Sequence, residues 1–172
     1  MKTINQLQNM SGRYAVITGA TGKLGKVISE TLVELDCNLI LVDLPGSNLS
    51  SLKTNLLKIR KVNIFTVSCD LEIEKSRETA LKEITNHHNK ISCLINNAAF
   101  VASSNLEGWL VPFENQSINS WRKAFEVNLT AAFHFTQALM PTLKDSIGAN
   151  IINITSIYGQ YGPDWSLYEN TN

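Results

Sequence analysis

A short apolar segment followed by three regularly spaced glycines constrains the fold of this chain most. Residues 14–17 are apolar and rich in β-branched side chains, as in a strand that is covered on both faces of a parallel sheet. Gly19, Gly22 and Gly25 follow at intervals of three. Such glycines allow a tight turn, a close approach of the backbone to a diphosphate, and close packing of the next helix on the strand. The pattern indicates a dinucleotide-binding turn, and an ordinary strand–helix turn is the alternative.

A second apolar segment, residues 38–43, ends in an acidic residue. Asp43 lies 18 residues beyond Gly25, close to the spacing of about 20 in dinucleotide-binding folds. A carboxylate at this point can accept hydrogen bonds from both hydroxyls of an adenosine ribose and would repel a 2′-phosphate. NAD is therefore favoured over NADP. The alternative is that Asp43 caps a turn formed with Pro45 and Gly46.

Strand patterns alternate with helical patterns along the rest of the chain. Further strand patterns occupy residues 62–67, 91–95 and 150–155, and apolar residues recur at helical spacing in residues 24–35, 47–60, 73–89 and 117–144. This alternation predicts parallel strands joined by right-handed crossovers. The expected fold class is α/β, a doubly wound parallel sheet of the Rossmann type.

Single residues predict where some of these helices begin and end. Ser47 and Ser50 are expected to cap the second helix, and Ser117 is expected to begin the fourth. Pro141 is expected to kink or end that fourth helix, because proline lacks an N–H group.

Composition and charge exclude several classes of protein. The chain has 172 residues, of which 44% are hydrophobic and 17% charged, so it is expected to form one globular domain. Fifteen basic and fifteen acidic residues cancel, which argues against nucleic acid and anionic membranes as partners. No apolar segment has the length of a membrane span, and residues 1–12 lack the apolar stretch of a signal peptide. A cytoplasmic location is expected.

The three cysteines are Cys37, Cys69 and Cys93. Their odd number, their wide spacing and their apolar surroundings predict reduced thiols in the core of the protein. Neither a disulfide framework nor a metal site is expected.

Further short motifs follow the glycine turn in a characteristic order. Residues 69–71 read Cys-Asp-Leu, residues 96–99 read Asn-Asn-Ala-Ala, residues 127–129 read Val-Asn-Leu, and residues 153–156 read Asn-Ile-Thr-Ser. Together with residues 18–25, they make the chain resemble the short-chain dehydrogenase/reductase family over essentially its whole length. In that family the first motif accepts a hydrogen bond from the adenine amino group, and the second supports the sheet beside the cofactor.

The resemblance implies an NAD(P)-dependent oxidoreductase that transfers hydride between nicotinamide and a carbonyl or secondary alcohol. It implies catalytic roles for Asn128, which orders a water, and Ser156, which hydrogen-bonds the substrate oxygen. A small-molecule substrate and a homo-oligomer are also implied, with the helix at residues 117–144 at the subunit interface; the alternative is that the sheet alone buries the apolar face of this helix. The cofactor-binding residues implied are Gly19, Thr21, Gly22, Lys23, Leu24, Gly25, Asp43, Asp70, Leu71, Asn97, Ala98 and Ala99.

Two residues depart from the commonest family pattern. Lys23 stands where most classical members have glycine, and the resulting glycine spacing is closer to that of the extended branch, which handles nucleotide sugars. Lys23 can lean toward a phosphate and soften the preference for NAD. Ala99 replaces the usual final glycine of its turn. Residues 156–159 and 162–169 also resemble members linked to sugar or flagellin modification.

The family's tyrosine and lysine pair is absent. In the family a tyrosine transfers the proton, and a lysine four residues later lowers its pKa. No tyrosine of this chain has a lysine at that position, and Tyr168 is followed there by Asn172. We therefore expect a domain that is incomplete at its C-terminus, with the sheet truncated after about the fifth strand and no catalysis by the 172 residues alone. A nucleotide-binding module without catalysis and a nucleotide-sugar epimerase or dehydratase are the alternative functions.

Overall fold

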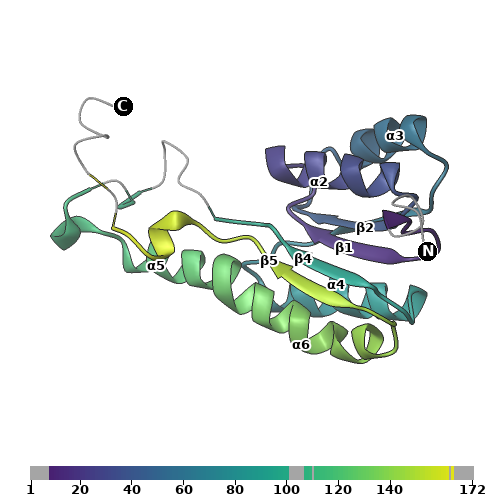
Figure 1. Ribbon diagram of the computed structural model, residues 1–172. Helices are drawn as coiled ribbons and strands as arrows, with labels where there is room; N and C mark the ends of the chain where they lie inside the picture. Colours follow the sequence, from purple (N-terminus) through teal and green to yellow (C-terminus); the bar gives the residue numbers. More distant parts are fainter. Residues whose placement is uncertain (1–7, 101–106, 110, 163, 165–172) are drawn as a thin grey trace.

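A parallel sheet of five strands forms the centre of the computed structural model, which describes residues 8–100, 107–109, 111–162 and 164 (Figure 1). The strand order is β3-β2-β1-β4-β5, and every neighbouring pair is parallel. This order confirms the doubly wound sheet predicted from the alternation of patterns. The strands are β1 (Tyr14–Thr18), β2 (Asn38–Asp43), β3 (Ile64–Ser68), β4 (Cys93–Asn96) and β5 (Asn150–Asn153).

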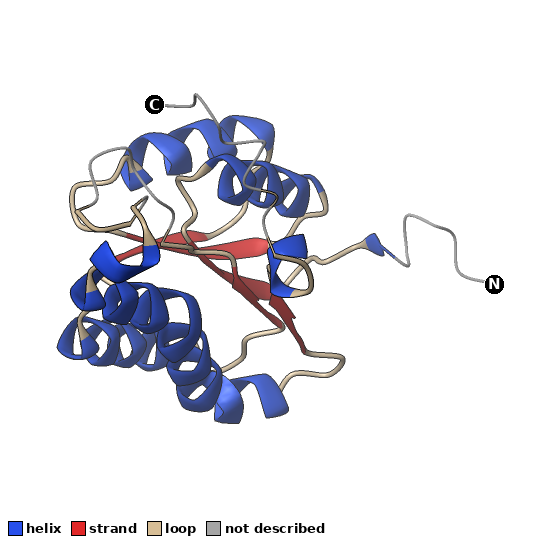
Figure 2. Ribbon diagram, turned by 90° about the vertical axis from the view of Figure 1, so that its left-hand side faces the viewer, coloured by secondary structure: helices blue, strands red, loops and turns tan. Residues whose placement is uncertain are grey.

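Helices cover both faces of the sheet. Figures 1 and 2 show α2 and α3 on one face and α4 and α6 on the other. Short 3₁₀ turns, η1 (Phe113–Asn115) and η3 (Ile157–Gly159), lie outside these layers. The helices are α2 (Lys23–Glu34), α3 (Leu49–Ile59), α4 (Glu74–His87), α5 (Ile118–Phe125) and α6 (Ala131–Lys144).

Strands β1 and β2 are almost wholly apolar because alternate side chains face different helices. Val16 belongs to a buried cluster with Ile84 of α4 and Phe135 of α6. The next residue, Ile17, belongs to a second cluster with Leu56 of α3. A strand that buries both faces in this way gains free energy from every side chain, which explains the unbroken apolar runs in the sequence.

Helices α5 and α6 form one run, because the π turn η2 (Glu126–Thr130) joins them without a break. Ser117 is the N-cap of α5, and its hydroxyl accepts a hydrogen bond from the Ser120 N–H at 3.3 Å, which confirms the predicted start. Pro141 does not end the run, which continues to Lys144. Only one N–H group is lost at Pro141, and the buried side chains of α6 hold its last turn against the sheet.

The expected cap of α3 is wrong. Its N-cap is Asn48, and no side chain caps the helix. Ser50 lies inside the helix, and the Ser47 hydroxyl is buried without a partner among the residues that the structure describes. Helix α3 is held instead by burial of Leu49 and Leu52 against the sheet.

Along the described parts of the chain, no helix combines the length and the apolar character that crossing a membrane requires.

Candidate functional site

The turn between β1 and α2 requires glycine at two positions. Gly19 has φ +65°, and a Cβ atom there would lie 2.8 Å from the Cα atom of Ala98. A Cβ atom on Gly25 would collide with the Gly19 carbonyl oxygen and lie 2.8 Å from the Cα atom of Ala20. Side chains at either position would therefore force the backbone apart. The turn lies between β1 and β4, where the strand order reverses, and parallel sheets bind ligands at this point.

The N-terminus of α2 is free to bind an anion. Gly22 is the N-cap, and a glycine has no side chain that could bond to the first turn. The first N–H groups of a helix have no partner within it and carry the positive end of the helix dipole. An uncapped helix behind a glycine turn therefore suits a diphosphate.

Asn97 fixes the end of β4 to the end of β1. Its side-chain amide donates to the carbonyl oxygens of Thr18 and Gly19 at 2.9 and 3.1 Å. The Thr18 hydroxyl accepts hydrogen bonds from the Asn97 and Ala98 N–H groups, both at 3.1 Å. These bonds hold the Asn-Asn-Ala-Ala segment against the glycine turn.

Asp43 bonds across to the same turn from the end of β2. Its Oδ2 atom accepts from the Thr21 N–H at 2.7 Å and from the Thr21 hydroxyl at 2.8 Å, and its Oδ1 atom accepts from the Leu44 N–H at 2.8 Å. The carboxylate thus ties β2 to the turn. The alternative role noted in the sequence analysis was that Asp43 caps the turn after β2. Of the three bonds, only the one from the Leu44 N–H corresponds to that role.

The segment after β3 is also ordered by hydrogen bonds. The Asp70 N–H donates to the Ser76 hydroxyl at 2.9 Å, and the Asp70 carboxylate accepts from the Glu72 N–H at 3.0 Å. The Leu71 carbonyl oxygen accepts from the guanidinium of Arg77 at 2.5 Å. Asp70 and Leu71 therefore have defined positions at the carboxyl end of β3.

These segments surround one hollow of about 650 Å³ at the carboxyl ends of the strands. Among the described residues that line it, Lys23 carries a positive charge and Asp43, Asp70 and Glu72 carry negative charges. Of the cofactor-binding residues expected from the sequence, Gly25 alone does not line it, because Gly25 packs beneath the turn. The lining residues are Gly19, Thr21, Gly22, Lys23, Leu24, Asp43, Leu44, Cys69, Asp70, Leu71, Glu72, Asn97, Ala98, Ala99, Phe100 and Val127.

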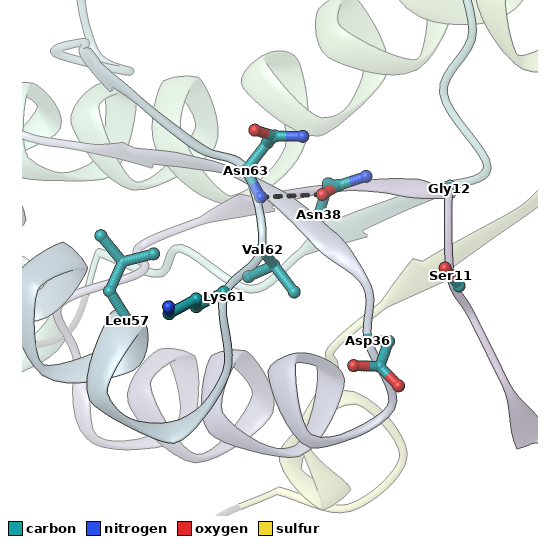
Figure 3. Close-up of a pocket in the computed structure, with 8 residues that line it drawn as sticks. All are labelled: Ser11, Gly12, Asp36, Asn38, Leu57, Lys61, Val62 and Asn63. Atoms are coloured by element: carbon teal, nitrogen blue, oxygen red, sulfur yellow. Dashed lines mark hydrogen bonds between the residues drawn. The ribbon is translucent and has the colours of Figure 1, made fainter.

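A second hollow, of about 690 Å³, lies at the opposite ends of the strands (Figure 3). Asp36 and Lys61, which line it, each follow the C-cap residue of a helix, α2 and α3 respectively. Helix C-termini carry partial negative charge and disfavour phosphates. The dashed line in Figure 3 is the hydrogen bond from the Asn63 N–H to Asn38 Oδ1, at 2.8 Å, which joins the starts of β2 and β3. The hollow beside the glycine turn is therefore the better candidate for a nucleotide.

Neither of the two residues expected to be catalytic lines the hollow beside the glycine turn. Asn128 is in the π turn, where its side chain accepts from the Phe100 N–H at 2.6 Å and donates to the Phe100 carbonyl oxygen at 3.4 Å. Ser156 is the exposed N-cap of η3, and its hydroxyl accepts from the Tyr158 N–H at 3.2 Å. Tyr168 lies outside the described residues.

Sequence reasoning missed five residues that line the hollow, namely Leu44, Cys69, Glu72, Phe100 and Val127. Phe100 lies one residue beyond the Asn-Asn-Ala-Ala motif and binds Asn128 through its backbone. Val127 precedes Asn128 and also lines the hollow. Neither Phe100 nor Val127 has a reactive side chain, so only their positions beside Ala99 and Asn128 in the sequence could have indicated that they line the hollow.

The cysteines are buried and free. Burial raises the pKa of the Cys69 and Cys93 thiols to about 11 and that of Cys37 to about 12. Cys69 lines the hollow, but a thiol with such a pKa is protonated at neutral pH and is a poor nucleophile. The described residues contain no cluster of His, Cys, Asp and Glu that could hold a metal ion.

A family model described as short chain dehydrogenase matches residues 13–171. The chain belongs to this family. An uncharacterized oxidoreductase of Staphylococcus epidermidis is 26% identical over 147 residues, which cover 86% of this chain and 59% of that protein. Family members are oxidoreductases that use a nicotinamide dinucleotide, and the glycine turn with its uncapped helix fits such a group.

Two solved structures share the fold. An NAD⁺-bound xylitol dehydrogenase has 23% identity and a TM-score of 0.77, covering 90% of this chain and 56% of that one. The L-sorbose reductase of Gluconobacter frateurii, complexed with NADPH and L-sorbose, has 22% identity and a TM-score of 0.77, covering 87% of this chain and 54% of that one. The chain thus spans little more than half the length of these proteins.

Proposed function

We propose that residues 1–172 form a single NAD(P)-binding domain of an oxidoreductase acting on a carbonyl or secondary alcohol. The observation that carries this proposal is the uncapped first turn of α2 behind Gly19 and Gly25, at the reversal of strand order. The family supports the type of chemistry. When bound, the nicotinamide supplies or accepts the hydride.

The residues around the hollow have separate roles in holding the nucleotide. The N–H groups of Lys23 and Leu24 bind the diphosphate at the start of α2, and Gly22, whose own N–H donates to the Gly19 carbonyl oxygen at 3.1 Å, lets the diphosphate approach the backbone. Asp43 binds the adenosine ribose, and Asp70 accepts from the adenine amino group while Leu71 contacts the ring. Asn97, Ala98 and Ala99 form the wall at the end of β4, and Gly25 lets α2 approach β1 closely.

Asn128 and Ser156 act on the substrate rather than on the nucleotide in this proposal. Hydrogen bonds from and to Phe100 hold the Asn128 amide in one orientation, so that it can order a water. Ser156 accepts from the Tyr158 N–H, which leaves its own hydroxyl hydrogen to donate to a substrate oxygen.

NAD is the preferred cofactor in this proposal. Asp43 places negative charge where a 2′-phosphate would lie, whereas Lys23 at the helix start provides one positive charge on the other side of the turn. The structural neighbours with NAD⁺ and with NADPH show that the fold accommodates both dinucleotides.

A binding module without catalysis is the second candidate function. It is favoured by one observation, the absence of any tyrosine with a lysine four residues later in the 172 residues. The two candidates share the nucleotide site and differ in proton transfer alone.

Fluorescence titration of the purified chain with NADH and NADPH tests the shared site. Saturable binding with NADH favoured supports the proposal. Absence of binding of either nucleotide at millimolar concentration overturns both candidates. The coding sequence downstream of residue 172 separates the two, because an in-frame Tyr-x-x-x-Lys supports the oxidoreductase and a stop codon at that point supports the binding module.

A homo-oligomer is also proposed, through one face of the α5–η2–α6 run. Five large apolar side chains on this face are between 46% and 65% exposed, although most such side chains in the sheet-facing layers are buried. They recur every three to four residues, as in a helix that packs on a partner. A second copy of the chain is the proposed occupant. The residues are Ile118, Trp121, Phe125, Leu129 and Phe133.

Analytical ultracentrifugation tests this interface. A Leu129→Glu variant is expected to shift the protein toward the monomer. Ile147→Glu is the matched control, because Ile147 is 95% exposed and lies outside this face. A parent protein that remains a monomer at every concentration would refute the interface.

A further inference from the structure

Arg77 is a charged residue in the interior of the protein. It lies on α4, and its side chain is 3% exposed. A buried guanidinium requires partners for its donors, because burial without them is costly. Its partners come from two different walls of the nucleotide hollow.

The first wall is the segment after β3. One terminal nitrogen of Arg77 donates to the carbonyl oxygens of Leu71 and Glu72, at 2.5 and 3.2 Å. Both residues line the hollow and follow Asp70, the residue proposed to bind adenine.

The second wall is the π turn. The same nitrogen of Arg77 lies 3.0 Å from the Glu126 carboxylate, and the Arg77 Nε atom donates to His134 Nδ1 at 3.4 Å. Glu126 begins the π turn and directly precedes Val127, which lines the hollow, and Asn128. Arg77 is thus bonded both to the segment after β3, which is proposed to bind adenine, and to the π turn that carries Asn128.

A second ion pair joins the same two walls nearer the surface. Lys123 of α5 lies 3.4 Å from the Glu72 carboxylate, and both side chains are 36% exposed. Because the Lys123 pair faces water, it is worth less than the Arg77 pair, where one partner is fully enclosed.

We propose that Arg77 is a positioning residue of the nucleotide site, which acts through Glu126. It fixes the π turn relative to the segment at residues 70–72, so that occupancy of the adenine end is coupled to the position of Asn128. The inference rests on the proposed function, since it assigns the adenine end to that segment. Arg77 itself touches neither the nucleotide nor the substrate.

ADP is the probe that tests the coupling, because it occupies the adenine end and contains no nicotinamide. In the parent protein, ADP is expected to shift the backbone amide resonances of Asn128 and Leu129 in heteronuclear NMR spectra. In Glu126→Gln, which keeps the shape but loses the charge, these shifts are expected to disappear. ADP affinity is expected to fall about twofold to thirtyfold, the range for residues that mediate coupling between sites.

Two control variants separate positioning from general loss of stability. Leu143→Ala opens a cavity in the same core cluster, at the far end of α6, and is expected to lower the melting temperature without changing ADP affinity. Glu78→Gln breaks an exposed ion pair with Lys75 on α4 and is expected to change neither quantity.

The outcomes distinguish this inference from the function on which it rests. If the parent protein binds neither ADP nor NADH, the proposed function fails. If the parent binds ADP and Glu126→Gln matches it in both affinity and resonance shifts, the positioning role of Arg77 is refuted. If Arg77 acts through Glu126, the double variant Arg77→Met with Glu126→Gln should weaken ADP binding no more than Arg77→Met alone. Additive losses of ADP affinity would also refute the positioning role.

Discussion

Asp43 and Thr21, which lie on different elements, are joined by two hydrogen bonds to a single carboxylate oxygen. With the third bond from the Leu44 N–H, the carboxylate already uses three of its roughly four acceptor sites. A ribose that binds through both hydroxyls must therefore displace or share one of these bonds. The Thr21 hydroxyl is the easiest to displace, because it can rotate, whereas the two N–H groups are fixed by the backbone.

We predict that Asp43→Ala narrows the preference for NADH over NADPH. The substitution removes the hydrogen bonds to the ribose and the repulsion of a 2′-phosphate together. A hydrogen bond to a charged group contributes about 1.5–3 kcal/mol, so NADH affinity should fall about tenfold to a hundredfold. Fluorescence titration with both nucleotides measures the change. An unchanged ratio of the two dissociation constants would contradict the role of Asp43.

Thr21→Val is the matched variant for the same site. It removes the hydroxyl that competes with the ribose and keeps the N–H bond to Asp43. NADH affinity is expected to stay within about threefold of the parent, since one displaced hydrogen bond is replaced by another. A loss as large as that of Asp43→Ala would mean that the Thr21 hydroxyl itself binds the nucleotide.

Gly22→Ala is predicted to separate binding from folding. A Cβ atom on Gly22 would lie 3.2 Å from the Gly19 carbonyl oxygen, which must shift by a few tenths of an ångström, and the extended Gly22 backbone is one that alanine adopts. The melting temperature should change little, while NADH affinity falls at least about tenfold because the methyl group occupies the approach of the diphosphate. Tight NADH binding by Gly22→Ala would place the diphosphate elsewhere.

Two further glycine variants serve as controls for the effect of Gly22→Ala on melting temperature and NADH affinity. Gly25→Ala should unfold the turn, since its Cβ atom would overlap backbone atoms that cannot move aside. Gly148→Ala should cost stability through its φ of +69° but leave NADH affinity unchanged, because nothing lies within 4 Å of the added atom.

The sequence predicts the centre of the sheet well because β1, β2 and β4 are short, mostly apolar and almost wholly buried. The inward residues of α4, Ala80, Leu81 and Ile84, are also buried as their spacing suggests. The side-chain hydrogen bonds and ion pairs that join different elements could not be predicted from the sequence. The bond from Thr21 to Asp43 spans 22 positions, and the burial of Arg77 contradicts the usual exposure of a charged helix residue.

The long helix illustrates a different limit of the sequence. The same apolar residues suit a continuous helix and one with a π turn, because a single extra residue in the hydrogen-bond ladder leaves the pattern nearly unchanged. The sequence could therefore place Asn128 on the helix, but not in the π turn that brings it to Phe100.

His88 is predicted to make the stability of the fold depend on pH. Its ring packs 4.7 Å from that of Tyr14 and 5.2 Å from that of Phe65, and its buried Nε2 atom has no partner among the described residues. Burial, and next the charge of His87, lower the pKa of His88 from its ordinary value of 6.5. Above pH 6.5 the imidazole is neutral in both states, so its contribution is constant. Below pH 6.5 the unfolded chain takes up the proton first, so stability falls until the lowered pKa is passed.

Urea unfolding between pH 5 and pH 8 measures this dependence. His88→Phe keeps an aromatic ring against Tyr14 and Phe65 and cannot be protonated, so it should flatten the loss of stability on the acid side. His87→Phe removes only the second cause of the lowered His88 pKa, so it should reduce the acid-side loss of stability without abolishing it. An acid-side slope that is the same in His88→Phe and the parent would assign the dependence to other groups.

The final prediction is that the 172-residue chain binds NADH without reducing a carbonyl. Asn128 and Ser156 can position a water and a substrate oxygen, but neither supplies a proton at neutral pH. Tyr158 and Tyr161 are followed four residues later by Gly162 and Trp165, so neither has the lysine that the family places at that position.

Positioned general acid–base catalysis contributes about a hundredfold to ten-thousandfold in rate, so turnover should fall below that of a complete dehydrogenase by at least this factor. The assay follows NADH oxidation with a panel of ketones and ketoses, with the L-sorbose reductase of Gluconobacter frateurii as the positive control. NADH binding measured in the same samples shows that the protein is folded. Turnover comparable with the control would refute the prediction, and Tyr158→Phe and Tyr161→Phe variants would then identify whether either phenol donates the proton.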